Sequence, residues 1–147
     1  MPQVTYSKVL DASADQVWAL VRDFGALAQW FPFVSNCELK DGARPDQVGA
    51  VRVNTVAEGA LIEETLLELS DRDRRLVYSL TKGDVPTTDY SATLTIHEVS
   101  ADGRAFAEWS ARFDVSGDPA PIVKWVRQDI FQICLDELER VVKQSAR

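Results

Sequence analysis

Glu64 has the clearest potential for chemistry, because it stands in the middle of the apolar, strand-like stretch LIEETLLEL (61–69). If Ile62, Glu64 and Leu66 share the inward face of a strand, a carboxylate enters an apolar interior, where it needs a polar partner. It could then anchor a ligand hydroxyl or act as a general acid or base. Two structural alternatives stay open: the opposite register, which leaves Glu64 in solvent, and a buried pair with Arg52 that serves the fold alone.

Arg52 and Tyr90 are the two residues expected to interact with this carboxylate. Arg52, in the stretch GAVRV (49–53), could balance Glu64 or an acidic ligand, or it could point outward into solvent. Tyr90 begins the clearest alternation in the chain, on its apolar face, where a phenol usually forms a hydrogen bond. Its partner could be a ligand, a water or Glu64, or it could be an ordinary core tyrosine. If the protein is an enzyme, Glu64 and Tyr90 are the predicted catalytic groups.

Other kinds of active site lack the residues they need. His97 is the single histidine and falls on the polar face of its strand, so no Ser/His/Asp or Cys/His arrangement is expected inside. The sequence has no HExxH or CxxC motif, no phosphate loop and no dinucleotide fingerprint. Cys134 is interpreted as a small buried hydrophobe. We therefore expect no metal and no cofactor, and any catalysis would be cyclisation, dehydration or isomerisation.

The periodicity of apolar residues predicts the elements that must position these side chains. Strands are predicted at 3–11, 34–40, 49–57, 61–69, 75–82, 90–97 and 107–115. A helix over 15–23, capped by Ser13 or Asp11, follows the first strand, and a second short helix is predicted over 26–30. A long helix over 119–144 has a broad apolar arc and ends the chain.

Alternation on one face with hairpin turns is typical of an antiparallel sheet with one solvated side. A sheet of about seven strands must curve, and one long helix is the natural element for it to wrap. We predict a single α+β domain over residues 1–147, with a curved antiparallel sheet gripping helix 119–144 and residues 13–30 closing one end. The space between sheet and helix must be filled by large side chains or by a bound molecule.

The composition of the chain limits the kinds of partner that it is expected to bind. The 147 residues are 46% hydrophobic and carry a net charge of −7, which argues against nucleic acid and anionic membranes. No run approaches the length of a membrane span, and the N-terminal residues do not resemble a signal peptide. Two cysteines are too few for a disulfide scaffold. A cytoplasmic monomer or homodimer is therefore expected, with no membrane insertion.

Six stretches of the chain form a series whose order and spacing are informative: ASADQVW (12–18), WFPFV (30–34), GAVR (49–52), the strand and turn 64–74, DYS (89–91) and the long helix. Together they resemble the START-like (SRPBCC) superfamily with its helix-grip fold. This superfamily includes bacterial polyketide cyclase/dehydrase-like proteins, plant abscisic acid receptors and birch-pollen-allergen-like carriers. The likeness is greatest to small bacterial cyclase-like proteins, among them accessory proteins associated with methanol oxidation.

The resemblance implies a ligand pocket between sheet and helix. Positions that match the lining of the abscisic acid receptors' pocket are Ser35, Arg52, Glu64, Tyr78, Leu80, Tyr90, Val126, Ile130, Ile133 and Cys134. Ser35 stands where the receptors have the lysine that pairs with the hormone's carboxylate, so hormone reception is not expected. Two aromatic residues complete the predicted site. Phe33 would lie at the entrance, and Trp109 has small neighbours that leave room for a ligand or for the helix.

We therefore expect the chain to bind a small hydrophobic molecule, either lipid or polyketide-like, in an internal cavity. One alternative is a cofactor-independent polyketide cyclase or dehydratase that uses Glu64 and Tyr90. The other is a non-catalytic accessory protein that binds another protein through loops near Glu58–Ala60 or Val85–Thr87.

Overall fold

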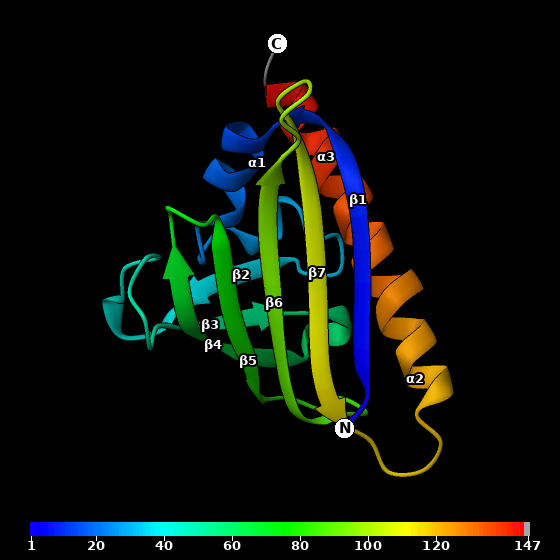
Figure 1. Ribbon diagram of the computed structural model, residues 1–147. Helices are drawn as coiled ribbons and strands as arrows, with labels where there is room; N and C mark the ends of the chain where they lie inside the picture. Colours follow the sequence, from blue (N-terminus) through cyan, green and yellow to red (C-terminus); the bar gives the residue numbers. More distant parts are fainter. Residues whose placement is uncertain (146–147) are drawn as a thin grey trace.

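Seven antiparallel strands form one sheet in the computed structural model, which describes residues 1–145. The strands are β1 (Gln3–Ser13), β2 (Asn36–Leu39), β3 (Val51–Thr55), β4 (Leu61–Ser70), β5 (Arg75–Lys82), β6 (Thr88–Glu98) and β7 (Arg104–Asp114). Their spatial order is β1-β7-β6-β5-β4-β3-β2, so β1 pairs with β7 and the other pairs are neighbours in sequence. Figure 1 shows β2, β3 and β4 turned away from the direction of β6 and β7, as a strongly curved sheet requires.

Alternation decides which face of the sheet is buried. In β7 the buried positions are Ala105, Ala107, Trp109, Ala111 and Phe113, and in β6 they are Tyr90, Ala92, Leu94 and Ile96. The curvature has a local cause in β4, whose pairing with β5 shifts register between Glu63 and Glu64 and again between Leu66 and Glu68. Such irregularities bend a strand and increase its twist.

Two short helices follow β1 and close one end of the sheet. Helix α1 (Ala14–Val21) begins with a capping box: Ser13 Oγ accepts a hydrogen bond from the backbone N–H of Gln16, and Gln16 Oε1 accepts one from the N–H of Ser13. Its buried side packs against β6, β7 and the end of the chain's last helix. A single 3-10 turn, η1 (Leu27–Gln29), occupies the place predicted for a second short helix.

The C-terminal helix is continuous over 26 residues but changes its pitch. It consists of α2 (Ala120–Lys124), the π-helical η4 (Trp125–Gln132) and α3 (Ile133–Ser145), coloured orange to red in Figure 1. In a π-helix residues five apart lie on one side, and Val126 and Phe131 are both buried. The predicted stripe assumed α-helical spacing throughout, which is why it grouped the 41% exposed Ile133 with the fully buried Cys134.

The predicted fold class is confirmed, including the antiparallel sheet around a long terminal helix. Two predicted strands are shorter than expected, since 34–40 is reduced to β2 and 49–57 to β3. Some of the lost residues belong to tight turns, such as the one in which Val56 N–H donates to the carbonyl of Ala60. Within residues 1–145, no helix has the length and apolar character needed to cross a membrane.

Candidate ligand-binding site

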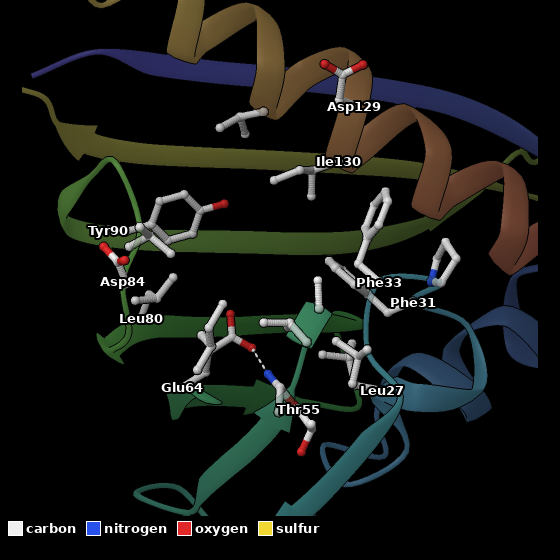
Figure 2. A pocket seen from close by; sticks show the side chains of 18 of the residues that line it. Leu27, Phe31, Phe33, Thr55, Glu64, Leu80, Asp84, Tyr90, Asp129 and Ile130 are labelled. Carbon is white, nitrogen blue, oxygen red and sulfur yellow. Dashed lines mark hydrogen bonds between the residues drawn. The ribbon is translucent and has the colours of Figure 1, made fainter. Parts of the chain in front are cut away.

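A cavity of about 1050 Å³ lies between the strands β3 to β5 and the C-terminal helix. Four parts of the chain surround it: the segment that follows η1, the β3–β4 turn, the β5–β6 connection and the helical residues 125–133. Figure 2 shows Leu27, Phe31 and Phe33 on one side, Leu80 and Tyr90 on the other, and Ile130 descending from the helix. The lining is therefore mostly apolar, with a few polar groups at defined places.

Glu64 is the buried acidic residue of this lining, with 9% of its surface exposed. It lies directly across from Arg52 in the β3–β4 pairing and from Leu80 in the β4–β5 pairing. Its Oε1 accepts hydrogen bonds from Arg52 Nε at 2.8 Å and Asn54 Nδ2 at 2.9 Å. Among the described residues, no hydrogen bond reaches Oε2. In Figure 2 the carboxylate points into the space below the helix.

Arg52 lies behind Glu64 rather than on the cavity surface. Its guanidinium Cζ is 4.0 Å from the ring centroid of Phe24 and 5.0 Å from that of Tyr78. Its Nη1 donates to the carbonyl oxygen of Phe24 at 3.4 Å. Arg52 is thus held by three neighbours, and it supports Glu64 from the side away from the cavity.

Tyr78 and Tyr90 supply the phenolic groups of the site. Burial raises the pKa of Tyr90 well above its ordinary value, and the neighbouring Tyr78 and Glu64 add to the effect. Burial, followed by Glu64, raises the pKa of Tyr78 as well. Both phenols therefore stay protonated at neutral pH. The ring of Tyr90 is stacked on Phe113, with centroids 5.7 Å apart, which fixes its direction.

Trp109 belongs to an aromatic cluster behind the cavity. Its ring stacks on Phe131 with centroids 4.2 Å apart, while Trp30 and Phe31 pack against it at 5.8 and 6.0 Å. This contact joins β7 to the C-terminal helix. Of the two arrangements left open by the sequence, the structure shows the one in which Trp109 packs against the helix.

The structure distributes the predicted site residues between the surface of the cavity and the layer behind it. Those on its surface are Phe33, Ser35, Glu64, Tyr78, Leu80, Tyr90, Val126, Ile130 and Ile133. Arg52, Trp109 and Cys134 do not line it. Cys134 is fully buried, and burial, followed by Glu137, raises the pKa of its thiol. No base contacts this thiol among the described residues, so it packs as a hydrophobe.

Sequence reasoning missed Asn54, Asp84 and Asp129, which also line the cavity. Asn54 could have been found, since it lies two residues after Arg52 on the same strand and therefore on the same face. Asp84 belongs to an irregular connection. Asp129 lies in the π-helical segment, where α-helical spacing misplaces residues.

Comparisons with known proteins give a consistent result. A family model described as "Polyketide cyclase / dehydrase and lipid transport" matches residues 1–143. The abscisic acid receptor PYL7 of Arabidopsis thaliana is 30% identical over 98 residues, which cover 67% of this chain and 46% of the receptor. The chain spans about half the length of the abscisic acid receptors that it matches.

Solved structures extend the similarity over the whole chain. The protein XoxI from Bacillus cereus has a TM-score of 0.86 at 26% identity, covering 100% of this chain and 99% of that one. A protein from Thermobifida fusca, solved by solution NMR, has a TM-score of 0.85 at 32% identity. The match covers 98% of this chain and 95% of the Thermobifida fusca chain.

Proposed function

The chain belongs to the polyketide cyclase/dehydrase and lipid transport family, and from this premise we propose that it binds a small, largely apolar molecule between the sheet and the C-terminal helix. Glu64 is the observation that carries the proposal. Its carboxylate is buried, is held through Oε1 by Arg52 and Asn54, and presents Oε2 to a mostly apolar cavity. Ligand sites in proteins are mostly apolar, with a few polar groups that orient the ligand.

The size of the cavity supports the same function. At about 1050 Å³ it lies just above the roughly 300–1,000 Å³ usual for small-molecule sites, so it has room for a ligand of that class. The phenol of Tyr90 adds a hydrogen-bond donor to the acceptor provided by Glu64. The related receptors bind abscisic acid, as their name states, but Ser35 in this chain provides no positive charge for a carboxylate, so another ligand is expected.

The compartment and the oligomeric state are part of the proposal. The two cysteines of the chain, Cys37 and Cys134, are both free thiols. Free thiols favour a reducing compartment such as the cytoplasm. We expect a monomer or a homodimer there, with a small molecule rather than nucleic acid as its partner.

Native mass spectrometry of the freshly purified protein, followed by organic extraction, tests whether a molecule co-purifies. Binding of the neutral fluorescent dye N-phenylnaphthylamine then tests the cavity itself. Leu80→Trp places an indole in the cavity and should weaken dye binding by about tenfold or more. The matched variant Leu67→Trp changes a side chain of β4 that is 47% exposed and lies outside the cavity, so it should bind the dye like the parent protein.

The proposal would be overturned if native mass spectrometry showed the protein without a bound molecule and the two tryptophan variants bound the dye equally. A protein partner bound through the loops at Glu58–Ala60 or Val85–Thr87 would then be the function to test.

A cyclase or dehydratase is a second candidate, favoured by one observation. The hydroxyl of Tyr90 and the carboxylate of Glu64 point into the same cavity (Figure 2). Because Tyr90 stays protonated, it could donate to a substrate carbonyl while Glu64 accepts a proton from the adjacent carbon. Incubation with poly-β-ketone thioesters would show loss of water by mass spectrometry. Glu64→Gln would abolish that turnover while still binding substrate, whereas a carrier would show no turnover in either form.

A further inference from the structure

Among residues 1–145, the charged side chains that line the cavity of the proposed function are all acidic. Within residues 1–145, its charged lining consists of Glu58, Glu64, Asp84 and Asp129. Glu64 is buried, and the other three are exposed to solvent. A ligand in the cavity therefore has a carboxylate at its buried end and three further negative charges around it, which add to the negative potential although the Asp129 carboxylate points away from the cavity in Figure 2.

Arg52, the buried cation nearest to Glu64, is not available to a ligand. Its Nε is bound to Glu64 Oε1 at 2.8 Å, and its Nη1 is directed to the carbonyl of Phe24 at 3.4 Å. Its side chain does not reach the cavity surface. An anionic ligand group would have to lie against the Glu64 carboxylate to approach Arg52, and two carboxylates side by side in an apolar environment repel each other strongly.

The second carboxylate oxygen of Glu64, Oε2, suits a ligand group that donates a hydrogen bond. The side chain is about nine-tenths buried, and its Oε2 can only accept hydrogen bonds while the carboxylate is ionised. A buried acceptor without a partner is unfavourable, so a ligand that brings an N–H or O–H group to this position gains from the match.

We propose that the cavity selects apolar ligands that bring a hydrogen-bond donor to Glu64 and carry no negative charge. This rests on the proposed function and specifies its ligand class: neutral or cationic aromatic and alicyclic amines or alcohols bind, and carboxylates, phosphates and sulfonates are excluded.

Two dyes with the same skeleton test this selection. N-phenylnaphthylamine and anilinonaphthalenesulfonate share the ring system and the N–H group, and differ by one sulfonate. Both are titrated by fluorescence at low ionic strength, where the charges of Glu58, Asp84 and Asp129 are least screened. We expect the neutral dye to bind the parent protein more tightly by about tenfold or more.

Because the sulfonate is also the less apolar dye, a variant must attribute the preference to charge. The cavity variant combines Glu58→Gln, Asp84→Asn and Asp129→Asn. The control variant combines Glu38→Gln, Asp41→Asn and Glu98→Gln, which are exposed, have no ion pair among the described residues and lie outside the cavity. Both variants change the net charge equally. The cavity variant should narrow the affinity ratio of the two dyes by about fivefold or more, and the control variant should leave it unchanged.

The outcomes are distinguishable. Equal changes in both variants would show an effect of net charge alone and would overturn the selection. Equal binding of the two dyes to the parent protein would also overturn it. If neither dye binds the parent protein, the proposed function itself fails, and the ligand class fails with it.

Discussion

At the scale of single residues, Glu64 and Arg52 depend on each other. Both side chains are almost fully buried, and they form an ion pair with each other. Removing one partner of a buried pair leaves an uncompensated charge, which typically costs about 3–5 kcal/mol. We expect Glu64→Ala to lower the free energy of unfolding by this amount in urea denaturation. The double variant Glu64→Leu with Arg52→Met should be less destabilised, because no charge is left behind.

Glu68 provides the control for this prediction. It lies on the same strand and pairs with Arg75 at 3.2 Å, but both side chains are about half exposed. Exposed pairs contribute about 0–1 kcal/mol, so Glu68→Ala should have a small effect. The interpretation of Glu64 as a buried, charge-paired group is wrong if the two alanine variants unfold at the same urea concentration.

The free energy of unfolding should depend strongly on the volume of the Trp109 side chain and only weakly on its N–H group. Within residues 1–145, no hydrogen bond of ordinary geometry reaches its Nε1, although Tyr78 lies close to it, while its ring stacks on Phe131. Replacing a buried tryptophan with alanine costs about 3–5 kcal/mol, which we expect for Trp109→Ala. Trp109→Phe should cost less, since a phenyl ring retains part of the stacking on Phe131 and no hydrogen bond of ordinary geometry is lost. Trp125→Phe, at a side chain that is 37% exposed, is the surface control.

Urea denaturation of these three variants checks the prediction. If Trp109→Phe were as destabilising as Trp109→Ala, the indole N–H would be making a strong interaction, with Tyr78 as the nearby partner.

For a single residue, the sequence is a good guide to the face of the strand on which its side chain lies. It is a poorer guide to the residues that this side chain contacts. Alternation put Tyr90 on the apolar face of its strand but left two registers open for Glu64, and the structure has both side chains inward. Alternation could not place Arg52 behind Glu64 or Trp109 behind the cavity. Those positions depend on side-chain rotamers and on the packing of the ring of Phe131, neither of which follows from a two-residue period.

At the scale of elements, the π-helical segment η4 is the part of the long helix that faces the cavity. π-helical turns are rare and occur frequently at functional sites, and the cavity deprives this one of packing on one side. Local opening is easiest where contacts are fewest. We therefore predict that the backbone amides of Trp125–Gln132 exchange with deuterium faster than those of α3.

Hydrogen exchange followed by mass spectrometry or NMR measures this difference, with the capped helix α1 as an internal reference. Addition of N-phenylnaphthylamine should slow exchange in η4 and leave α1 unchanged. Equal protection of η4 and α3 in the unliganded protein would contradict the prediction.

The elements themselves could largely be predicted, because most have strong periodicity. Strand β5 has the predicted bounds, 75–82, and Ser13, one of the two predicted caps, is the cap of α1. The π-helical turn could not be predicted, since apolar residues at positions 126, 130 and 133 fit α-helical spacing equally well. The widened turn depends on how Val126 and Phe131 pack against the sheet, which is a tertiary effect.

At the scale of the whole molecule, Lys8, Glu139 and Asp11 tie the first strand to the last helix. Lys8 Nζ is 3.0 Å from Glu139 Oε1, and the backbone N–H of Asp11 donates to Glu139 Oε2 at 2.6 Å. Burial opposes ionisation of Glu139, but the Asp11 N–H and the Lys8 ammonium outweigh it and hold the pKa of Glu139 below its ordinary value of 4.5.

A carboxyl whose pKa is lowered by folding stabilises the protein above its ordinary pKa, and this contribution is lost as the pH falls through the lowered value. We therefore expect the free energy of unfolding to decrease as the pH falls below about 4.5. Glu139→Gln should make this decrease less steep in urea denaturation at several pH values. Glu98→Gln, at an exposed residue without an ion pair among those described, should retain the steepness of the parent protein.

The pairing of β1 with β7 has a consequence for how the chain is made. Gln3 lies opposite Arg112 in this pairing, and Figure 1 shows the blue and yellow strands side by side. On the ribosome, β1 emerges more than a hundred residues before its partner, and its apolar residues Val4 and Leu10 have no strand to pair with in the meantime. A nascent chain that stops before Arg104 cannot close the sheet. Such intermediates are expected to bind chaperones until translation supplies β7.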